Sequence, residues 1–137
     1  MPSGPTASSG DQTPVPSAMA SFNERVETTR DARSWLAAFL RNWGIAAPII
    51  ADAVLVASEL VTNALRHGAG AAVVRASIRE SVIQLSVTDS GDDLPEQQSI
   101  DLGRVGGLGL HVVERVSEDW GVAAFPGGKT VWALIPC

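Results

Sequence analysis

Hydrophobic residues recur along this chain with two different periods, and the order of those periods limits the folds open to it. Apolar residues three and four apart, the spacing of an amphipathic helix, occupy Thr29 to Gly44 and Pro48 to Gly68. Alternating apolar runs follow at Ala72 to Ile78 and Val82 to Val87, with three polar residues between them. The sequence therefore predicts two helices and then a hairpin of strands.

The C-terminal half carries the same two periods. Leu108 to Val116 has helical spacing, and Trp120 to Phe125 and Thr130 to Ile135 are short apolar runs on either side of a Pro-Gly-Gly turn. Ser90 to Gly107 has neither period and is rich in Gly, Asp, Gln and Ser. A loop of that length inside a compact domain is uncommon and usually functional or disordered. We therefore expect a third helix, a second hairpin and one long loop.

The predicted order is helix, helix, strand, strand, loop, helix, strand, strand, which does not alternate as a doubly wound parallel sheet does. The expected fold class is an α/β (α+β) two-layer sandwich, with about three helices covering one face of a mixed, mostly antiparallel sheet. Residues 1–18 are dense in Pro, Ser, Gly and Thr and predict a disordered tail, so the folded domain is expected at residues 19–137. Met19 to Val26 has room for one short strand.

The composition is that of an ordinary globular domain and argues against several classes of partner. Hydrophobic residues make up 45% of the 137 residues, and the formal net charge is -5. An acidic chain opposes the phosphate attraction behind most nucleic-acid binding, so no direct DNA or RNA partner is expected. The one cysteine, Cys137, predicts no intrachain disulfide and a reducing compartment. We identify no apolar run of about 20 residues and no signal peptide, and therefore expect a soluble cytoplasmic protein with no membrane contact.

Three polar clusters are candidates for chemistry, and the first lies on the second predicted helix. Glu59 and Asn63 are four residues apart, so they lie one turn above the other near the boundary of the apolar arc. One interpretation is a solvated helix face. The other is a carboxylate base beside a neutral oxygen ligand, because Mg²⁺ often binds through one or two protein oxygens plus substrate phosphates.

The other two clusters flank the long loop. Asp89, Ser90 and Gly91 follow a predicted strand, where a carboxylate can accept a hydrogen bond from an exocyclic amino group and glycine lets the backbone approach a flat ring. An ordinary turn explains these residue types equally well. Gly103 to Leu110 runs into the third helix, where bared amides and Arg104 predict an anion site. A mobile, glycine-rich linker is the alternative.

Two other kinds of site do not fit the sequence. Gly128, Lys129 and Thr130 look like the end of a P-loop, but a strand is predicted where that motif requires a helix. His67 and His111 have no cysteine or acidic cluster at metal-ligand spacing, and we interpret them as structural or surface residues.

Four segments, taken in order, resemble the ATP-binding boxes of the GHKL ATPase superfamily. They are SELVTNALRHG at Ser58 to Gly68, Asp89 to Gly91, GGLGL at Gly106 to Leu110, and GGKTVW at Gly127 to Trp132. The ordered combination is far more specific than any one box. Within the superfamily, the chain resembles the stand-alone anti-sigma-factor serine/threonine kinases of bacteria from Phe22 to Pro136.

The resemblance implies a role for each matching residue. Glu59 is expected to be the general base that polarises the attacking hydroxyl, and Asn63 is expected to bind Mg²⁺. Asp89 is expected to receive the adenine amino group, with Gly91 beneath the ring and Thr130 nearby through a water molecule. The residues expected around the phosphates are Arg104, Gly106, Gly107, Leu108 and Gly109.

The resemblance also implies ATP and Mg²⁺ as ligands and an activity. The expected protein is a serine/threonine kinase that phosphorylates a small antagonist protein and sequesters a sigma factor, and the resemblance allows a homodimer. The alternative hypothesis is a kinase-inactive, ATP-binding regulatory module, and the presence of Glu59 favours the enzyme. Lys129 stands where the family often has a small residue.

Overall fold

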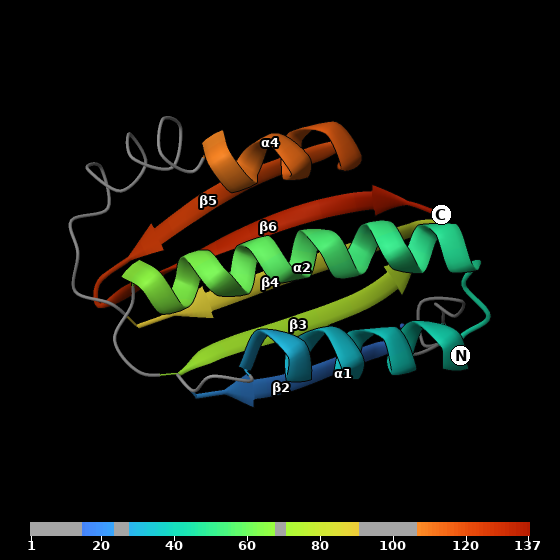
Figure 1. The fold of residues 1–137 in the computed structure, drawn as a ribbon, viewed down its shortest axis with the longest axis horizontal. Coiled ribbons are helices and arrows are strands. Elements are labelled where there is room, and N and C mark those ends of the chain that lie inside the picture. Colours follow the sequence, from blue (N-terminus) through green and yellow to red (C-terminus); the bar gives the residue numbers. More distant parts are fainter. Residues whose placement is uncertain (1–14, 24–27, 68–70, 91–106) are drawn as a thin grey trace, which may run out of the picture.

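The chain forms one antiparallel sheet with helices packed on one of its faces (Figure 1). The computed structural model describes residues 15–23, 28–67, 71–90 and 107–137. Each predicted helix and strand is found close to its expected bounds. In chain order the elements are β2 (Ser17–Phe22), α1 (Thr28–Asn42), α2 (Ala47–His67), β3 (Ala72–Arg79), β4 (Val82–Asp89), α4 (Gly107–Val116), β5 (Asp119–Phe125) and β6 (Gly128–Pro136).

The strand order is β2-β3-β4-β6-β5, and every neighbouring pair is antiparallel. This confirms the two-layer α/β fold class with one correction, because the described strands form a purely antiparallel sheet and not a mixed one. β6 lies between β4 and β5, so the two predicted hairpins join along β4 and β6. This junction places Asp89, at the end of β4, opposite Lys129, at the start of β6.

Both hairpins close through tight turns that contain residues with positive φ, which are glycine in one turn and non-glycine residues in the other. Glu80 and Ser81, between β3 and β4, have φ values of 52° and 66°, the left-handed conformation that a type I′ turn needs at both central positions. Between β5 and β6, Pro126 precedes Gly127, whose φ is 90°. Proline followed by a glycine of positive φ is typical of a type II turn. Short turns of this kind fix the register of the strands that they join.

The core lies between the sheet and the helices, with α2 at its centre. This helix contacts α1 and α4 on its flanks and β3, β4 and β6 beneath it. Side chains of β4 alternate between fully buried and less buried positions, as expected for a strand with one covered face. The largest fully buried side chains are Leu36, Leu40, Leu60, Ile83, Leu85, Ile135, Val56, Val61, Val74, Val87 and Val113.

The structure corrects two expectations about the chain's ends and its apolar segments. β2 starts at Ser17, so its first residues fall inside the expected tail, while residues 1–14 lie outside the described part of the chain. Residues Ala47–Arg66 are long and apolar enough to cross a membrane, by length and composition only, although we expected no such run. In this fold α2 supplies the centre of the core, which accounts for its apolarity.

Truncation of a buried leucine on α2 should cost far more stability than truncation of an exposed one. Leu60 is 1% exposed, whereas Leu55 on the same helix is 44% exposed. Leu60→Ala should lower the free energy of unfolding by about 2 to 5 kcal/mol, because it leaves a cavity in the core. Leu55→Ala, the matched control, should change it by less than about 1 kcal/mol. Urea unfolding measures both values, and equal losses would contradict this orientation of α2.

Candidate functional site

α2 and β4 end, and β6 begins, at one end of the molecule (Figure 1), and three buried polar side chains come from these positions. Asn63 lies in the last turns of α2, Asp89 ends β4, and Lys129 lies at the start of β6. Their exposed fractions are 5%, 4% and 2%, and Thr28 is the one other polar residue that is buried in the described ranges. Burial of polar groups costs free energy unless a partner compensates it, so the burial of these three polar side chains needs an explanation.

Strand alternation places Asp89 and Lys129 on the helix-covered face of the sheet. In β4, Val87 and Asp89 belong to the buried set of side chains, and in β6 Lys129 and Val131 do so. The β4–β6 register pairs Asp89 with Lys129 and Val87 with Val131. Since side chains two residues apart on a strand point to the same face, both members of the Asp89–Lys129 pair point toward the helices.

Lys129 and Asp89 form a buried ion pair. Nζ of Lys129 donates to Oδ2 of Asp89 at 2.5 Å, and the two side chains are 3% and 4% exposed. Removing two charges from water is costly, and their attraction offsets that cost only when the geometry is close. The two residues are therefore coupled, because loss of either one leaves the other charge buried without its counter-charge.

The close approach of β6 to β4 depends on a glycine next to Lys129. A Cβ at position 128 would lie 2.2 Å from the backbone oxygen of Asp89 and 2.9 Å from the ring of Phe125. Because the nearer obstacle is backbone, a side chain fits at Gly128 only if a strand moves. The contact with Asp89 thus explains this glycine of the GGKTVW segment.

Asn63 is the second buried feature, and its side-chain amide is incompletely paired. Its Nδ2 has no hydrogen-bond partner among the described residues. The amide oxygen suits Mg²⁺ and the amide N–H groups suit a phosphate oxygen, so the side chain fits both parts of a metal-bound nucleotide. Glu59, one turn earlier on α2, is only partly buried. The interpretation of Asn63 as part of a solvated helix face is wrong, because the rotation of α2 buries this side chain.

The structure separates Thr130 from the other expected site residues. Its Oγ1 lies 2.8 Å from Oγ1 of Thr88, its partner in the β4–β6 register, on the face opposite the helices. Thr130 is therefore not brought together with Asp89. The first residues of α4 are Gly107, Leu108 and Gly109. The expected residues that lie outside the described part of the chain are Gly91, Arg104 and Gly106.

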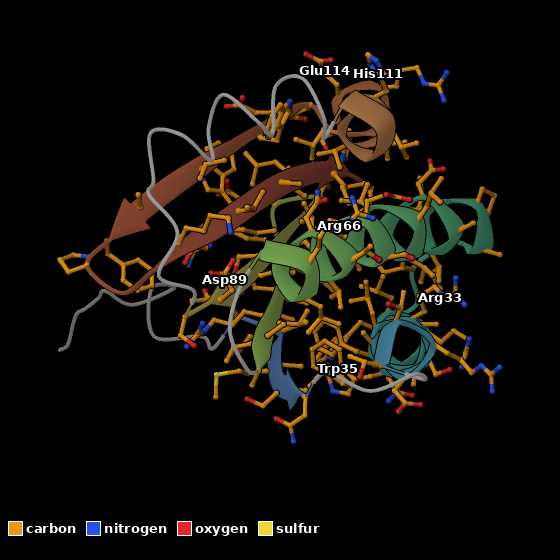
Figure 2. The ribbon with its side chains drawn as sticks, turned by 60° about the vertical axis from the view of Figure 1, so that its left-hand side comes forward. Arg33, Trp35, Arg66, Asp89, His111 and Glu114 are labelled. Carbon is orange, nitrogen blue, oxygen red and sulfur yellow. The ribbon has the colours of Figure 1, made fainter. Side chains whose placement is uncertain are left out.

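Other parts of the described surface offer less chemistry. A shallow hollow of about 500 Å³ on β2, β3 and β4 has Arg75 as its one ionisable lining residue. The described residues contain no group of three His, Cys, Asp or Glu side chains that could hold a metal ion. His111 is exposed on α4, as expected for a surface residue (Figure 2). The candidate site therefore consists of the Asp89–Lys129 ion pair and the incompletely paired side-chain amide of Asn63.

Loss of one member of the ion pair should destabilise the protein more than loss of both. Lys129→Met should lower the free energy of unfolding by about 3 to 5 kcal/mol, because Asp89 keeps its buried negative charge and loses the ammonium that offsets it. The double variant Asp89→Asn, Lys129→Met should recover much of that loss, since neither charge remains. Denaturant unfolding of the two single variants and the double variant gives the coupling free energy. Strictly additive losses would mean that the two side chains do not interact in solution.

Comparisons with known proteins assign the chain to a family. No significant match is found among curated proteins. Among solved structures, the fold is similar to that of the RsbU and RsbW domains of Rv1364c from Mycobacterium tuberculosis, with a TM-score of 0.69 and 23% sequence identity. That match covers 90% of this chain and 33% of the other, so this chain spans about a third of its length and the similarity shows the fold alone. Residues 22–135 match the histidine kinase-like ATPase domain. The chain therefore belongs to the family of histidine kinase-like ATPase domains.

Proposed function

We propose that this chain binds Mg·ATP at the end of the sheet that holds Asn63 and Asp89, and transfers the γ-phosphate to a hydroxyl of a small antagonist protein. In the same proposal it sequesters a sigma factor in the cytoplasm. The observation that carries the proposal is that Asn63 and Asp89, from separate sequence motifs, are buried polar side chains at one end of the fold. Membership of the histidine kinase-like ATPase family supports the choice of ATP.

The nucleotide is held at two chemically different ends. Asp89 accepts a hydrogen bond from the amino group of adenine, and its burial strengthens that bond relative to one in water. The amide oxygen of Asn63 would hold Mg²⁺, and the ion would supply positive charge that offsets the charge of the phosphates. Amides at the start of α4, near Gly107, are the donors expected to face the phosphates.

Glu59 acts on the attacking hydroxyl. It is partly exposed and lies one turn from Asn63, so a protein substrate can reach its carboxylate beside the metal ligand. The carboxylate accepts the proton of a serine or threonine hydroxyl while that oxygen bonds to the γ-phosphorus. The bond from this phosphorus to the bridging oxygen breaks, and ADP leaves. Positioning and charge stabilisation supply most of the rate, as in phosphoryl transfer generally.

The carboxylate of Glu59 should be needed for transfer and not for binding. Glu59→Gln should keep ATP affinity within about threefold, and should lower the rate of phosphate transfer to antagonist proteins of the same genome by about 10² to 10⁴. Asp52→Asn, at an exposed acid on the same helix, is the matched control and should change neither. Titration calorimetry and transfer of labelled γ-phosphate provide the two measurements.

Each failure of this experiment has its own meaning. Transfer by Glu59→Gln at the wild-type rate would remove Glu59 from the mechanism. ATP binding by the wild type without transfer to any antagonist would favour the kinase-inactive regulatory module. Absence of ATP binding in the wild type would contradict the whole proposal.

The side chain of Asn63 should contribute to nucleotide binding and should not stabilise the fold. Asn63→Ala should weaken Mg²⁺-dependent ATP binding by about tenfold or more, because a ligand contact worth at least about 1.5 kcal/mol is lost. It should leave the free energy of unfolding unchanged or higher, since it removes an incompletely paired buried amide and introduces the best helix former. Thr62→Ala, at the half-buried neighbouring position, is the control. Unchanged nucleotide affinity together with lost stability would make Asn63 a structural residue.

A further inference from the structure

The ion pair between Lys129 and Asp89 has a feature that the proposed function does not use. Lys129 is the single lysine of the chain, whose other cationic side chains are arginines. It is 2% exposed and lies directly beside the carboxylate to which we assign the adenine amino group. A buried ion pair is weak support for stability, because apolar side chains of similar volume stabilise a core as well or better. The presence of a charge at this position therefore needs a separate reason.

The pair offers a ligand one acceptor and one donor in a fixed order. A carboxylate has about four lone-pair sites, so Asp89 can accept from Lys129 and from an amino group at the same time. An ammonium has three N–H donors and no acceptor, and one donor of Lys129 is used by Asp89 Oδ2. A hydroxyl or a water molecule at this position can turn to donate or to accept. Lys129 can only donate.

This order matches adenine and not hypoxanthine or guanine. On the six-membered ring of adenine, the 6-amino group donates and the adjacent N1 accepts. Hypoxanthine and guanine carry the reverse order, since O6 accepts and N1–H donates. In the adenine pose, these two bases would set an oxygen against the carboxylate of Asp89 and an N–H group against the ammonium of Lys129. Contacts of like polarity in a buried site are strongly unfavourable.

We propose that Lys129 reads the base of the nucleotide: its Nζ donates to N1 of adenine while Asp89 accepts from the 6-amino group. The inference rests on the proposed ATP site and adds a specificity-determining residue to it. The ion pair has a positioning function in addition, because the 2.5 Å contact with Asp89 holds Nζ on the helix-covered face where the base edge must lie. Selectivity for adenine thus comes from two strands, with the acceptor on β4 and the donor on β6.

Nucleotide analogues test the contact without any mutation. In 1-deaza-ATP a C–H group replaces N1 and the 6-amino group is kept, so only the contact with Lys129 is lost. The wild-type protein should bind it about 10- to 100-fold more weakly than ATP, the range for a hydrogen bond to a charged donor. ITP, with the reversed order, should bind more weakly still. 7-Deaza-ATP, which keeps the whole edge, is the control and should bind like ATP.

A variant and a spectroscopic signal link that loss to Lys129 itself. Lys129→Met should bind ATP and 1-deaza-ATP with affinities that differ by less than about threefold, because no donor faces N1. Since the chain has one lysine, protein labelled with ¹⁵N at lysine Nζ has a single side-chain ammonium signal. ATP and 7-deaza-ATP should shift that signal alike, and 1-deaza-ATP should shift it less. This measurement stands even if Lys129→Met does not fold.

The outcomes separate this inference from the proposed function. Equal affinity of the wild type for ATP and 1-deaza-ATP, or the same ratio of affinities in Lys129→Met, overturns the inference and leaves the ATP site standing. Tighter ATP binding by Lys129→Met with an unchanged ratio also overturns it, because Lys129 would then compete with adenine for Asp89. Failure of the wild type to bind any of these nucleotides contradicts the proposed function instead.

Discussion

The packing of α2 against the centre of the sheet is the contact on which both the fold and the site depend. This helix contributes more residues to the buried core than any other described element, and it contacts α1, α4 and the sheet. Its rotation is set by the buried face, because Leu60 and Val61 must point to the sheet. The same rotation turns Asn63 inward and leaves Glu59 at the edge of the buried face. A buried amide and a partly exposed carboxylate, one turn apart, thus follow from the burial of the apolar face of one helix.

The second constraint is the register between β4 and β6. Side chains alternate along a strand, so a slip of one residue would exchange every buried position for an exposed one. In the observed register Lys129 faces Asp89 under the helices, and Thr130 faces Thr88 on the other side. Gly128 permits this register, since any Cβ there would meet the backbone oxygen of Asp89. Hydrophobic alternation and one close backbone contact therefore decide which side chain lies next to the carboxylate.

The site is also where the core departs from good packing chemistry. An apolar core would be at least as stable without a buried ion pair and an unpaired amide, yet this chain has both at one end of its sheet. Unsatisfied or costly groups of this kind are common where a protein binds a ligand, because the ligand supplies their hydrogen-bond partners. The remainder of the described core is aliphatic and alternates regularly, which leaves the stability of the fold to residues remote from the site.

The sequence by itself determined the order and type of the helices and strands, because period and turn chemistry are local properties. It also indicated Glu59, Asn63 and Asp89, because they lie in recognisable motifs. It did not determine which face of β6 the helices would cover. The family resemblance implied that Thr130 lies near the ligand, and Lys129 was left without a role. Only the tertiary structure decided this, since the partner of Lys129 lies 40 residues away in the sequence. A period of two specifies that neighbouring side chains alternate, and the pairing of β6 with β4 beneath α2 specifies which of them is buried.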